Sequence, residues 1–364
     1  MNSGNSLSDA RKEINEIDAK MCELFIRRMK AAEVIAEYKK ERGLAILDAE
    51  RELEVIKKNS EGVADEVIRE YYVNFIKSTM AVSRAYQSRL TEGMKVAYSG
   101  TVGAFAHIAS ERLFPDARKV SYGDFAAAYR AVENGECEVC VLPVENSYNG
   151  EVGQVTDLMF SGSLFVNGTY ELAISHDLLG APGASLDGIK TVISHPQALG
   201  QCAKYIKRHG YATQEFENTA LAAERVKELS DPSVAAIASA EAAKTFGLTV
   251  LDHDINESKS NTTRFAIFSR VPAKRARGEG GVHSILLFTV RNEAGALARA
   301  IEVIGSHGFN MRTLRSRPMK ELLWQYYFYV EAEGDLSSDE GVKMMEELGE
   351  FCDRLKVVGT YRSH

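Results

Sequence analysis

The chain has 364 residues, which suggests two or three domains at roughly 150 residues each. Hydrophobic residues make up 45% and charged residues 26%, close to the globular average, which argues against wholesale disorder and collagen-like repeats. No apolar run approaches the roughly 18 residues that span a bilayer, so we expect no membrane association. The net charge of -7 argues against a general nucleic-acid binder, because neutralising phosphates requires a clustered basic surface. Residues 1–6 show no readable secretory signal, and we therefore expect a cytoplasmic protein.

The five cysteines are an odd number without the spacing of a disulfide framework, so we expect reduced thiols. Cys137 and Cys140 form a Cys-x-x-Cys pair inside an apolar run that is typical of a strand. Buried packing is a better interpretation of this pair than a metal or redox site. The sequence therefore predicts no metal centre.

Residues 1–92 are predicted to form three helices. They lack proline and are rich in residues that favour helix. Apolar residues recur at steps of three and four through the opening segment, which predicts an amphipathic helix over residues 8–42. Gly43 would end it, a second helix would begin near Asp48, and a third would span residues 64–90. A helix as long as the first needs partner helices along its whole length.

The rest of the chain is predicted to form two further domains. Short apolar runs alternate with helical patterns over residues 94–271, which is typical of an α/β sheet with helices on its faces and leaves room for two lobes. A polar, basic stretch over residues 272–281 indicates a linker. Residues 282–364 follow the order strand, helix, strand, strand, helix, strand, which is the α+β ferredoxin-like plan. The second of these helices is expected over residues 339–355 and the last strand over residues 356–361.

Two basic residues of the first helix lie on its core-facing side. Arg28 falls within the apolar stripe, and Lys39, about three turns later, returns to the same side. A single arginine on a surface helix is usually solvated. Basic residues in a core-facing stripe, however, need an anion or a carboxylate partner.

The helical segment resembles the all-helical chorismate mutases. The matching residues are Arg11, Arg28, Lys39, Asp48, Arg51, Glu52, Ser83 and Gln87. The resemblance implies rearrangement of chorismate to prephenate, a pericyclic step that is accelerated by holding the folded conformer and stabilising charge. It implies carboxylate clamps at Arg11, Arg28 and Arg51. Lys39 and Gln87 would be the catalytic donors to the ether oxygen, which gains negative charge as its bond breaks.

The other three matching residues have polar roles in this resemblance. Glu52 would hold the substrate hydroxyl, with Asp48 and Ser83 in the polar shell around it. Asp48 also stands where the N-cap of the second helix is expected, and a cap is an equally good interpretation. The sequence leaves both roles for Asp48 open.

Arg11 and Arg28 are too far apart to grip one small ligand within a chain. They are separated by 17 residues on one predicted helix, which is about 26 Å at a rise of 1.5 Å per residue. If both contact the substrate, one of them must come from a second chain. We therefore predict a homodimer with long helices crossing antiparallel and two shared sites, as the resemblance also implies, and leave a tetramer open.

Three polar clusters of the middle domain resemble prephenate dehydratase. They are Pro-Val-Glu-Asn-Ser at residues 143–147, Ser-His-Pro-Gln at the start of residues 194–201, and Thr-Arg-Phe at residues 263–265. Each cluster alone is also typical of a turn or a helix cap. His195 is interpreted as structural, because Pro196 restricts its backbone to an extended turn. The resemblance implies two α/β lobes of the periplasmic-binding-protein type, with the site in the cleft between them.

The reaction that this resemblance implies converts prephenate to phenylpyruvate with loss of water and carbon dioxide. It needs a proton source at the leaving hydroxyl and a clamp on the pyruvyl carboxylate. Thr263 is the family's proposed acid, and Arg264 beside it is the carboxylate partner or the residue that orients it. A threonine hydroxyl is a weak acid, so Thr263 would relay a hydrogen bond. The polar residues expected to line the cleft and bind substrate are Glu145, Asn146, Ser147, Ser194 and Gln201.

The C-terminal module resembles the ACT domain, an amino-acid-sensing module of biosynthetic enzymes. Its two signatures fall at Gly295, Ala296 and Leu297, and at Arg315, Ser316, Arg317 and Pro318. Arg315 stands where the family has glutamate, which reverses a charge in the region that would bind the regulator. The resemblance implies phenylalanine as an effector bound between paired modules. The alternative is a module that only holds chains together.

The resemblances cover nearly the whole chain, in the domain order of the bifunctional chorismate mutase/prephenate dehydratases. They imply an enzyme of phenylalanine biosynthesis that acts on chorismate and prephenate without a metal or an organic cofactor. Two alternatives stay open for the middle domain. One is a preference for arogenate, the transaminated prephenate. The other is a catalytically inactive ligand-binding protein, because two-lobed α/β clefts often only bind.

Overall fold

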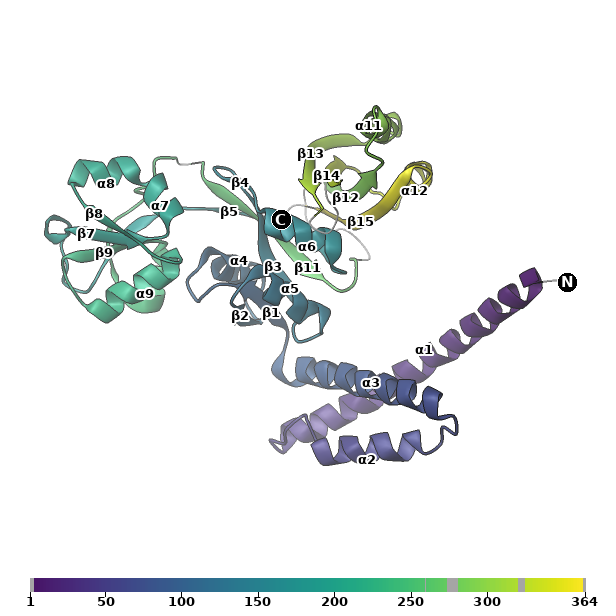
Figure 1. Ribbon diagram of the computed structural model, residues 1–364. Coiled ribbons are helices and arrows are strands. Elements are labelled where there is room, and N and C mark those ends of the chain that lie inside the picture. Colours follow the sequence, from purple (N-terminus) through teal and green to yellow (C-terminus); the bar gives the residue numbers. More distant parts are fainter. Residues whose placement is uncertain (1–2, 259, 274–280, 320–324, 363–364) are drawn as a thin grey trace. The chain divides into compact units, whose positions relative to one another are not determined.

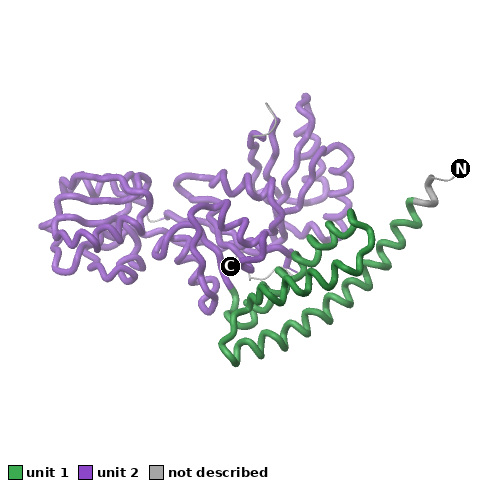
Figure 2. Tube along the Cα trace, turned by 60° about the horizontal axis from the view of Figure 1, so that its bottom comes forward, with its two compact units in different colours: residues 1–94 green, residues 95–364 purple. Residues whose placement is uncertain are grey.

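The computed structural model describes residues 3–258, 260–273, 281–319 and 325–362. The chain separates into two compact units, residues 1–94 and residues 95–364 (Figure 2). Over the described part of both units, no helix is long and apolar enough to cross a membrane.

The described part of the first unit consists of α1 (Ser3–Glu41), α2 (Ala49–Ser60) and α3 (Glu66–Glu92), as Figure 1 shows. The three predicted helices are therefore present. α2 begins after Asp48, whose side chain accepts a hydrogen bond from the Arg51 amide at 3.0 Å, so Asp48 is the N-cap of α2. Gly43, just after α1, has a φ of 63°, a left-handed conformation that glycine adopts without steric cost.

The other two helices cover α1 along only part of its length. Its buried residues are Ala32 and Ala36, in the half of the helix that contacts α3. The apolar stripe of its N-terminal half is exposed, at Ile14, Ile17, Met21, Leu24 and Phe25. Burying one such side chain stabilises an assembly by about 1.5–3 kcal/mol. The stripe is therefore suited to contact with a further helix.

The second unit begins with a lobe built on a six-stranded sheet, in which β11 runs antiparallel between β3 and β5. The strand order is β2-β1-β3-β11-β5, with β4 paired to β3. The strands are β1 (Lys95–Ser99), β2 (Arg118–Tyr122), β3 (Val139–Asn146), β4 (Gly150–Glu151), β5 (Phe165–Ala173) and β11 (Thr262–Ser269). Helices α4 (Phe105–Leu113), α5 (Phe125–Glu133) and α6 (Gly153–Ser161) connect them.

A second lobe is inserted between β5 and β11. Its five-stranded sheet has the order β10-β6-β9-β7-β8. The strands are β6 (Asp177–Gly180), β7 (Thr191–Ser194), β8 (Ala212–Glu215), β9 (Val234–Ala238) and β10 (Thr249–Asp252). The helices are α7 (Pro196–Gln201), α8 (Ala203–His209), α9 (Thr219–Leu229) and α10 (Ala240–Phe246). The chain crosses between the lobes once after β5 and once before β11, which confirms the predicted two-lobed α/β arrangement.

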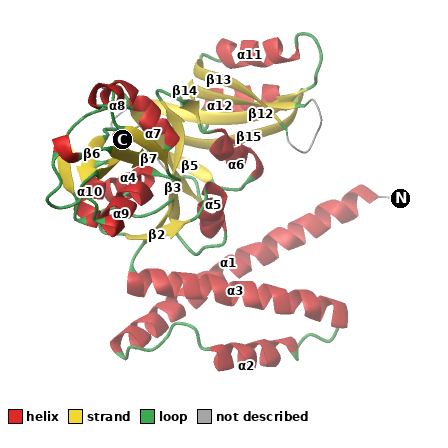
Figure 3. Ribbon diagram, turned by 60° about the vertical axis from the view of Figure 1, so that its left-hand side comes forward, coloured by secondary structure: helices red, strands yellow, loops and turns green. Residues whose placement is uncertain are grey.

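The described residues from 282 onward form a four-stranded antiparallel sheet with two helices. The elements in chain order are β12 (Val282–Val290), α11 (Ala296–Ser306), β13 (Asn310–Pro318), β14 (Tyr326–Glu333), α12 (Asp339–Gly349) and β15 (Cys352–Arg362). The sheet order β13-β14-β12-β15 is that of the ferredoxin-like plan. Helices α11 and α12 pack on one face of the sheet (Figure 3).

The end of this module differs from the prediction. α12 ends at Gly349, whereas the sequence predicts helix to residue 355. β15 begins at Cys352 and pairs with β12 along its length, with Cys352 opposite Val290 and Arg362 opposite Val282. Pairing with this buried strand outweighs the helical preference of residues 352–355, because strand formation depends on packing against neighbours.

The opposite face of the sheet packs directly on the first lobe. One buried cluster includes Leu142, Met159 and Phe268 of the lobe and Leu287 and Tyr361 of the module. Gly359 lies so close to the Val166 backbone that a Cβ atom would come within 2.0 Å of its carbonyl oxygen. Residues 274–280 of the predicted linker lie outside the described residues. The parts that the linker joins share one hydrophobic core.

Candidate active sites

Arg28 and two polar residues of α3 meet in the first unit. The Arg28 guanidinium donates to the Thr79 carbonyl at 3.2 Å and to the Ser83 hydroxyl. Burial lowers the pKa of Arg28, which still stays protonated. Gln87, one turn after Ser83, is 7% exposed, and its side-chain oxygen has no hydrogen-bond partner among the described residues. A buried polar atom without a partner costs stability, so Gln87 is placed for a partner from outside this chain.

The other predicted residues of this unit lie around α2. The Lys39 ammonium donates to the Ile46 carbonyl in the loop before α2. Glu52 forms an ion pair with Arg84 of α3. The Arg51 side chain is 63% exposed and pairs only within α2, so it faces solvent in this chain.

Arg11 lies on the exposed half of α1. That helix runs without interruption from Ser3 to Glu41. The 17 residues between Arg11 and Arg28 therefore correspond to about 26 Å along the helix axis. The separation on which the predicted shared site depends is present in the structure.

Thr263 and Asn146 stand opposite each other at the ends of β11 and β3. The Asn146 amide nitrogen donates to the Thr263 hydroxyl oxygen at 2.9 Å and to the Asn261 side-chain oxygen at 2.9 Å. Because the Thr263 oxygen accepts this bond, its hydroxyl proton is available to donate elsewhere. The Asn146 side-chain oxygen accepts from the backbone amides of Tyr148 and Asn149, both at 3.0 Å, which fixes the orientation of its side chain.

This network continues into the second lobe. Asn261 donates to the Gln201 side-chain oxygen at 3.0 Å, and the same oxygen lies 2.8 Å from His176 Nε2. Burial lowers the pKa of His176, so its ring is neutral at pH 7 and donates to Gln201 through Nε2. A hydrogen-bonded row from Thr263 through Asn146, Asn261 and Gln201 to His176 therefore links the two lobes.

Two members of this row are not among the predicted site residues. Asn261 stands two positions before Thr263, at the start of the polar run Asn-Thr-Thr-Arg-Phe over residues 261–265, and that position is the signal that identifies it. His176 has no comparable signal, because its partner Gln201 is 25 residues away in the sequence. Only the folded chain brings His176 to the row.

Three residues of the predicted motifs make structural contacts. Ser194 is fully buried and donates to the Ile237 carbonyl at 2.6 Å, so it ties β7 to β9 and does not line the cleft as the sequence predicts. Ser147 accepts from the Thr262 amide at 2.9 Å and holds the start of β11. His195 is the N-cap of α7, in keeping with its structural interpretation.

Glu145 and Arg264 occupy the opposite face of the same strand ends. They are cross-strand neighbours one position from Asn146 and Thr263, and side chains alternate faces along a strand. Arg264 donates to Glu145 at 2.9 Å and makes two further bonds of 2.9 Å to Glu331 of β14. Burial disfavours the charged form, but the Glu331 carboxylate raises the pKa of Arg264 overall. Because the carboxylates of Glu145 and Glu331 already hold the Arg264 guanidinium, Arg264 is better suited to orienting the strand beside Thr263 than to binding a substrate carboxylate. Glu145 faces the module and not the cleft.

Two cavities border the cleft between the lobes. One of about 270 Å³ is lined by Phe105 and Arg112 of the first lobe and by Ser239 and His253 of the second. The other, of about 40 Å³, is lined by residues that include Gln201 and Asn261, members of the hydrogen-bonded row. Two members of the row, Gln201 and Asn261, therefore border the space between the lobes.

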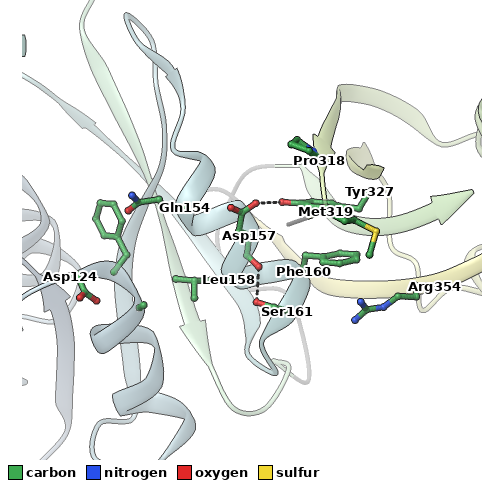
Figure 4. Close-up of a pocket in the computed structure, with 12 residues that line it drawn as sticks. Asp124, Gln154, Asp157, Leu158, Phe160, Ser161, Pro318, Met319, Tyr327 and Arg354 are labelled. Carbon is green, nitrogen blue, oxygen red and sulfur yellow. Dashed lines mark hydrogen bonds between the residues drawn. The ribbon is translucent and has the colours of Figure 1, made fainter. Parts of the chain in front are cut away.

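A larger cavity, of about 640 Å³, lies elsewhere, between α5, α6 and the C-terminal module (Figure 4). Phe160 stacks on Tyr327 with ring centroids 4.2 Å apart, and Arg354 lies over the Phe160 ring. Of the predicted site residues, Pro318 alone lines it. Size therefore does not identify the reaction site in this unit.

The predicted regulatory residues lie on two sides of the module. Gly295 is the N-cap of α11 and has a φ of 86°, and Leu297 lines a cavity of about 430 Å³. Arg315 and Arg317, two residues apart on β13, both face the first lobe. Arg315 pairs with Glu145 and, at 3.9 Å, with Glu151. Arg317 pairs with Glu151 and Asp157, both at 2.9 Å. Within one chain the two signatures therefore do not form a single site.

The possible metal ligands are dispersed. Cys137 and Cys140 are buried in the first lobe, as predicted, and burial raises the pKa of both thiols. Thiols in such surroundings are unreactive. Among the described residues, no three His, Cys, Asp or Glu side chains are placed to hold one metal ion.

Two family models match the chain. Chorismate mutase type II matches residues 10–88, and prephenate dehydratase matches residues 96–273. The bifunctional chorismate mutase/prephenate dehydratase of Escherichia coli strain K12 is 30% identical over 378 aligned residues, which cover 100% of this chain and 98% of that protein. The chain belongs to the bifunctional chorismate mutase/prephenate dehydratase family.

Solved structures share the fold of the second unit of this family member. A prephenate dehydratase from Arthrobacter aurescens, solved in complex with L-Phe, is 26% identical with a TM-score of 0.68 and covers 74% of this chain and 90% of its own. GqqA, described as a novel type of quorum quenching acylase, is 31% identical with a TM-score of 0.68 and covers 74% of this chain and 98% of its own. One fold thus carries different named activities, and function must be argued from the site.

Proposed function

We propose that the chain carries out two consecutive reactions of phenylalanine biosynthesis. The helical domain, residues 1–92, rearranges chorismate to prephenate, and the middle domain, residues 94–271, converts prephenate to phenylpyruvate. Similarity to a bifunctional relative along the full length of the chain supports both activities. The observation that carries the second activity is the hydrogen-bonded row from Thr263 to His176, which spans the two lobes.

The rearrangement needs charge around a folded substrate and no nucleophile. Arg28 is held by Ser83 between α1 and α3, where its planar fork suits a substrate carboxylate. Lys39 and Gln87 donate to the ether oxygen as its bond breaks. Arg11 comes from a second chain that docks on the exposed stripe of α1, so the chain acts as a homodimer.

In the dehydratase reaction, the ring carboxylate of prephenate leaves as carbon dioxide and the ring hydroxyl leaves as water. The electrons of the broken carbon-carbon bond complete the aromatic ring as the carbon-oxygen bond to the hydroxyl breaks, and the leaving hydroxyl takes a proton that Thr263 relays from solvent. Thr263 supplies the hydrogen bond at this hydroxyl, because Asn146 occupies its oxygen and leaves its proton free. Arg264 orients the end of β11 that carries Thr263. Neither reaction calls for a metal or an organic cofactor.

The C-terminal module, residues 282–364, is proposed to be an ACT domain through which phenylalanine regulates the enzyme. Its ferredoxin-like strand order supports this role, as does the related dehydratase that was solved in complex with L-Phe. The two signatures, at residues 295–297 and 315–318, lie on two sides of one module. The effector site is therefore expected where two modules pair.

Assays with separate substrates test this proposal. Purified chain is supplied with prephenate or with arogenate, and the products are resolved by mass spectrometry. We expect the chain to convert prephenate to phenylpyruvate faster than it converts arogenate to phenylalanine. Faster conversion of arogenate to phenylalanine would reassign the substrate, and binding without turnover would leave the middle domain a ligand-binding protein. A calorimetric titration with phenylalanine that shows no heat would leave the module a structural element.

A further inference from the structure

Four charged residues join the C-terminal module to the strand ends that carry Thr263. Arg264 and Glu145 belong to the first lobe, and Glu331 and Arg315 belong to β14 and β13 of the module. Arg264 makes two bonds of 2.9 Å to Glu331 and one of 2.9 Å to Glu145. Arg315 binds the other carboxylate oxygen of Glu145. These residues form a charged row of alternating sign, in the order Glu331, Arg264, Glu145, Arg315.

The charged row is largely withdrawn from water. Glu331 is 3% exposed, and it also accepts from the Tyr361 hydroxyl at 3.0 Å and the Tyr329 hydroxyl at 3.4 Å. The side chains of Arg264 and Arg315 are 19% and 23% exposed. A charge at such a site is costly without its partner. The position of each member is therefore set by the others.

The two faces of these strand ends carry different chemistry. Asn146 and Thr263 pair on one face, and Glu145 and Arg264, one position along each strand, pair on the other. The register between the strands shifts immediately afterwards, between Arg264 and Phe265. The strand ladder is locally disrupted at such a bulge and constrains its neighbours less. On its other side, β11 stays paired with β5 through Thr263 and Arg264. The charged row adds a constraint on the β3 side of the strand segment that holds the Thr263 hydroxyl, where the register shifts.

We propose that Arg315 and Glu331 are positioning residues for the dehydratase reaction, acting from the C-terminal module through Glu145 and Arg264. Neither contacts the substrate. Arg315 holds Glu145, and Glu331 holds Arg264, and this Glu145–Arg264 pair fixes the strand ends that carry Thr263. A displacement of about 1 Å at a reacting group can lower the rate about 10²-fold. The inference rests on the dehydratase activity proposed above.

Arg315→Gln tests this inference most directly, because loss of the Arg315 guanidinium still leaves Glu145 paired with Arg264. Loss of the charge is expected to lower kcat on prephenate about tenfold while KM stays within about twofold. Arg315→Lys keeps the charge and is expected to retain most of the rate. Glu331→Gln is expected to lower kcat further, because it leaves the Arg264 charge with one partner fewer.

Lys356→Met is the matched control at the same interface. Lys356 of β15 donates to the Met159 carbonyl at 2.6 Å and to the Gly162 carbonyl. The variant therefore removes a contact between module and lobe without touching the charged row, and its kcat is expected to stay near the wild-type value. The chorismate mutase rate of each variant, measured on the same preparation, reports an intact chain.

A double variant separates positioning from a general loss of stability. If Arg315 acts through Glu145, then Arg315→Gln adds nothing to Glu145→Gln, and the double variant has the kcat of Glu145→Gln alone. Three results would overturn the inference. They are a double variant whose loss of kcat is the product of the two single losses, a wild-type kcat in Arg315→Gln, and a loss of kcat in Lys356→Met equal to that in Arg315→Gln. A wild-type chain that is inactive on prephenate would overturn the proposed function instead.

Discussion

The helical unit and the dehydratase lobes differ in how much of a site one chain assembles. On α1, Arg11 and Arg28 lie about 26 Å apart, and Gln87 keeps a buried oxygen without a partner among the described residues. In the lobes, Thr263 is connected to His176 by an unbroken row of hydrogen bonds. One chain therefore connects the residues of the second site, whereas it leaves Arg11 apart from Arg28 and Gln87 unpartnered, as the proposed shared site requires.

The apolar residues around the two sites also differ in their exposure to solvent. The stripe of α1 beside Arg11 is exposed, and Leu24 within it is 58% exposed. The strands beside Thr263 share a buried core with the C-terminal module, in which Phe268 and Leu287 are fully buried. The apolar surface beside Arg11 is thus exposed, whereas the apolar surface beside Thr263 is buried.

The largest effect is expected for Thr263→Val, which removes the hydroxyl and keeps the shape. Without the donor at the leaving group, kcat on prephenate should fall by about 10²–10⁴-fold. The mutase rate of the same chain should not change, because its site lies in the other unit. Thr262→Val, one position away, is the control and should retain dehydratase activity. A dehydratase rate in Thr263→Val equal to that of the control would remove Thr263 from the reaction.

Mixed dimers test whether the mutase site is shared. Arg11→Ala and Arg28→Ala should each lose most mutase activity, because each removes a carboxylate clamp from both sites. A mixture allowed to exchange chains should recover about a quarter of the wild-type rate, since half of its dimers hold one intact site of two. Arg11→Ala mixed with the double variant cannot rebuild a site and is the control. No recovery above that control would refute sharing.

A charge placed on the exposed stripe should separate the two activities. Leu24→Asp puts an unpaired carboxylate where the partner helix is expected, and mutase activity should fall about tenfold and depend on protein concentration. Dehydratase activity should stay within about twofold. Leu229→Asp changes a residue of α9 that is 42% exposed and is the control. Equal mutase rates in both variants would show that the stripe has no partner.

The smallest effect concerns pH. Burial lowers the pKa of His176 below 6.5, its ordinary value. The stabilisation that depends on neutral His176 is therefore complete above about pH 6.5 and is lost as the pH falls toward the lowered pKa, because the unfolded chain takes up the proton first. His176→Asn cannot take up this proton. The decrease in unfolding free energy between pH 7 and pH 5 should be smaller in the variant, and equal decreases would contradict the assignment.

The sequence predicted elements whose signals are local. The steps of three and four along α1 and the break at Gly43 lie within a few residues of the structure they specify, and the cap is one of the two roles that the sequence leaves open for Asp48. The start of β15 at Cys352 was missed, because pairing with β12 overrides local preference. The shared core of lobe and module has no local signal, since its residues are far apart in the chain.

The candidate site likewise has residues that the motifs identify and contacts that only the fold shows. Thr263, Asn146 and Gln201 belong to motifs, and the structure brings them into one row. Ser194 also belongs to a motif, but its hydroxyl is buried in the second lobe and donates to the Ile237 carbonyl. Arg264 was identified from its motif, but its partner Glu331 is 67 residues away and no spacing rule connects them. The direction in which a side chain points, and its contacts with residues far away in the sequence, can be known only from the folded structure.

One measurement tests the central claim, that this single chain performs two consecutive reactions at separate sites. Purified chain receives chorismate alone, and chorismate, prephenate and phenylpyruvate are followed over time by mass spectrometry. We predict that prephenate appears first and phenylpyruvate then accumulates without any added cofactor. Chorismate that stays unchanged, or prephenate that accumulates without phenylpyruvate, would contradict the claim.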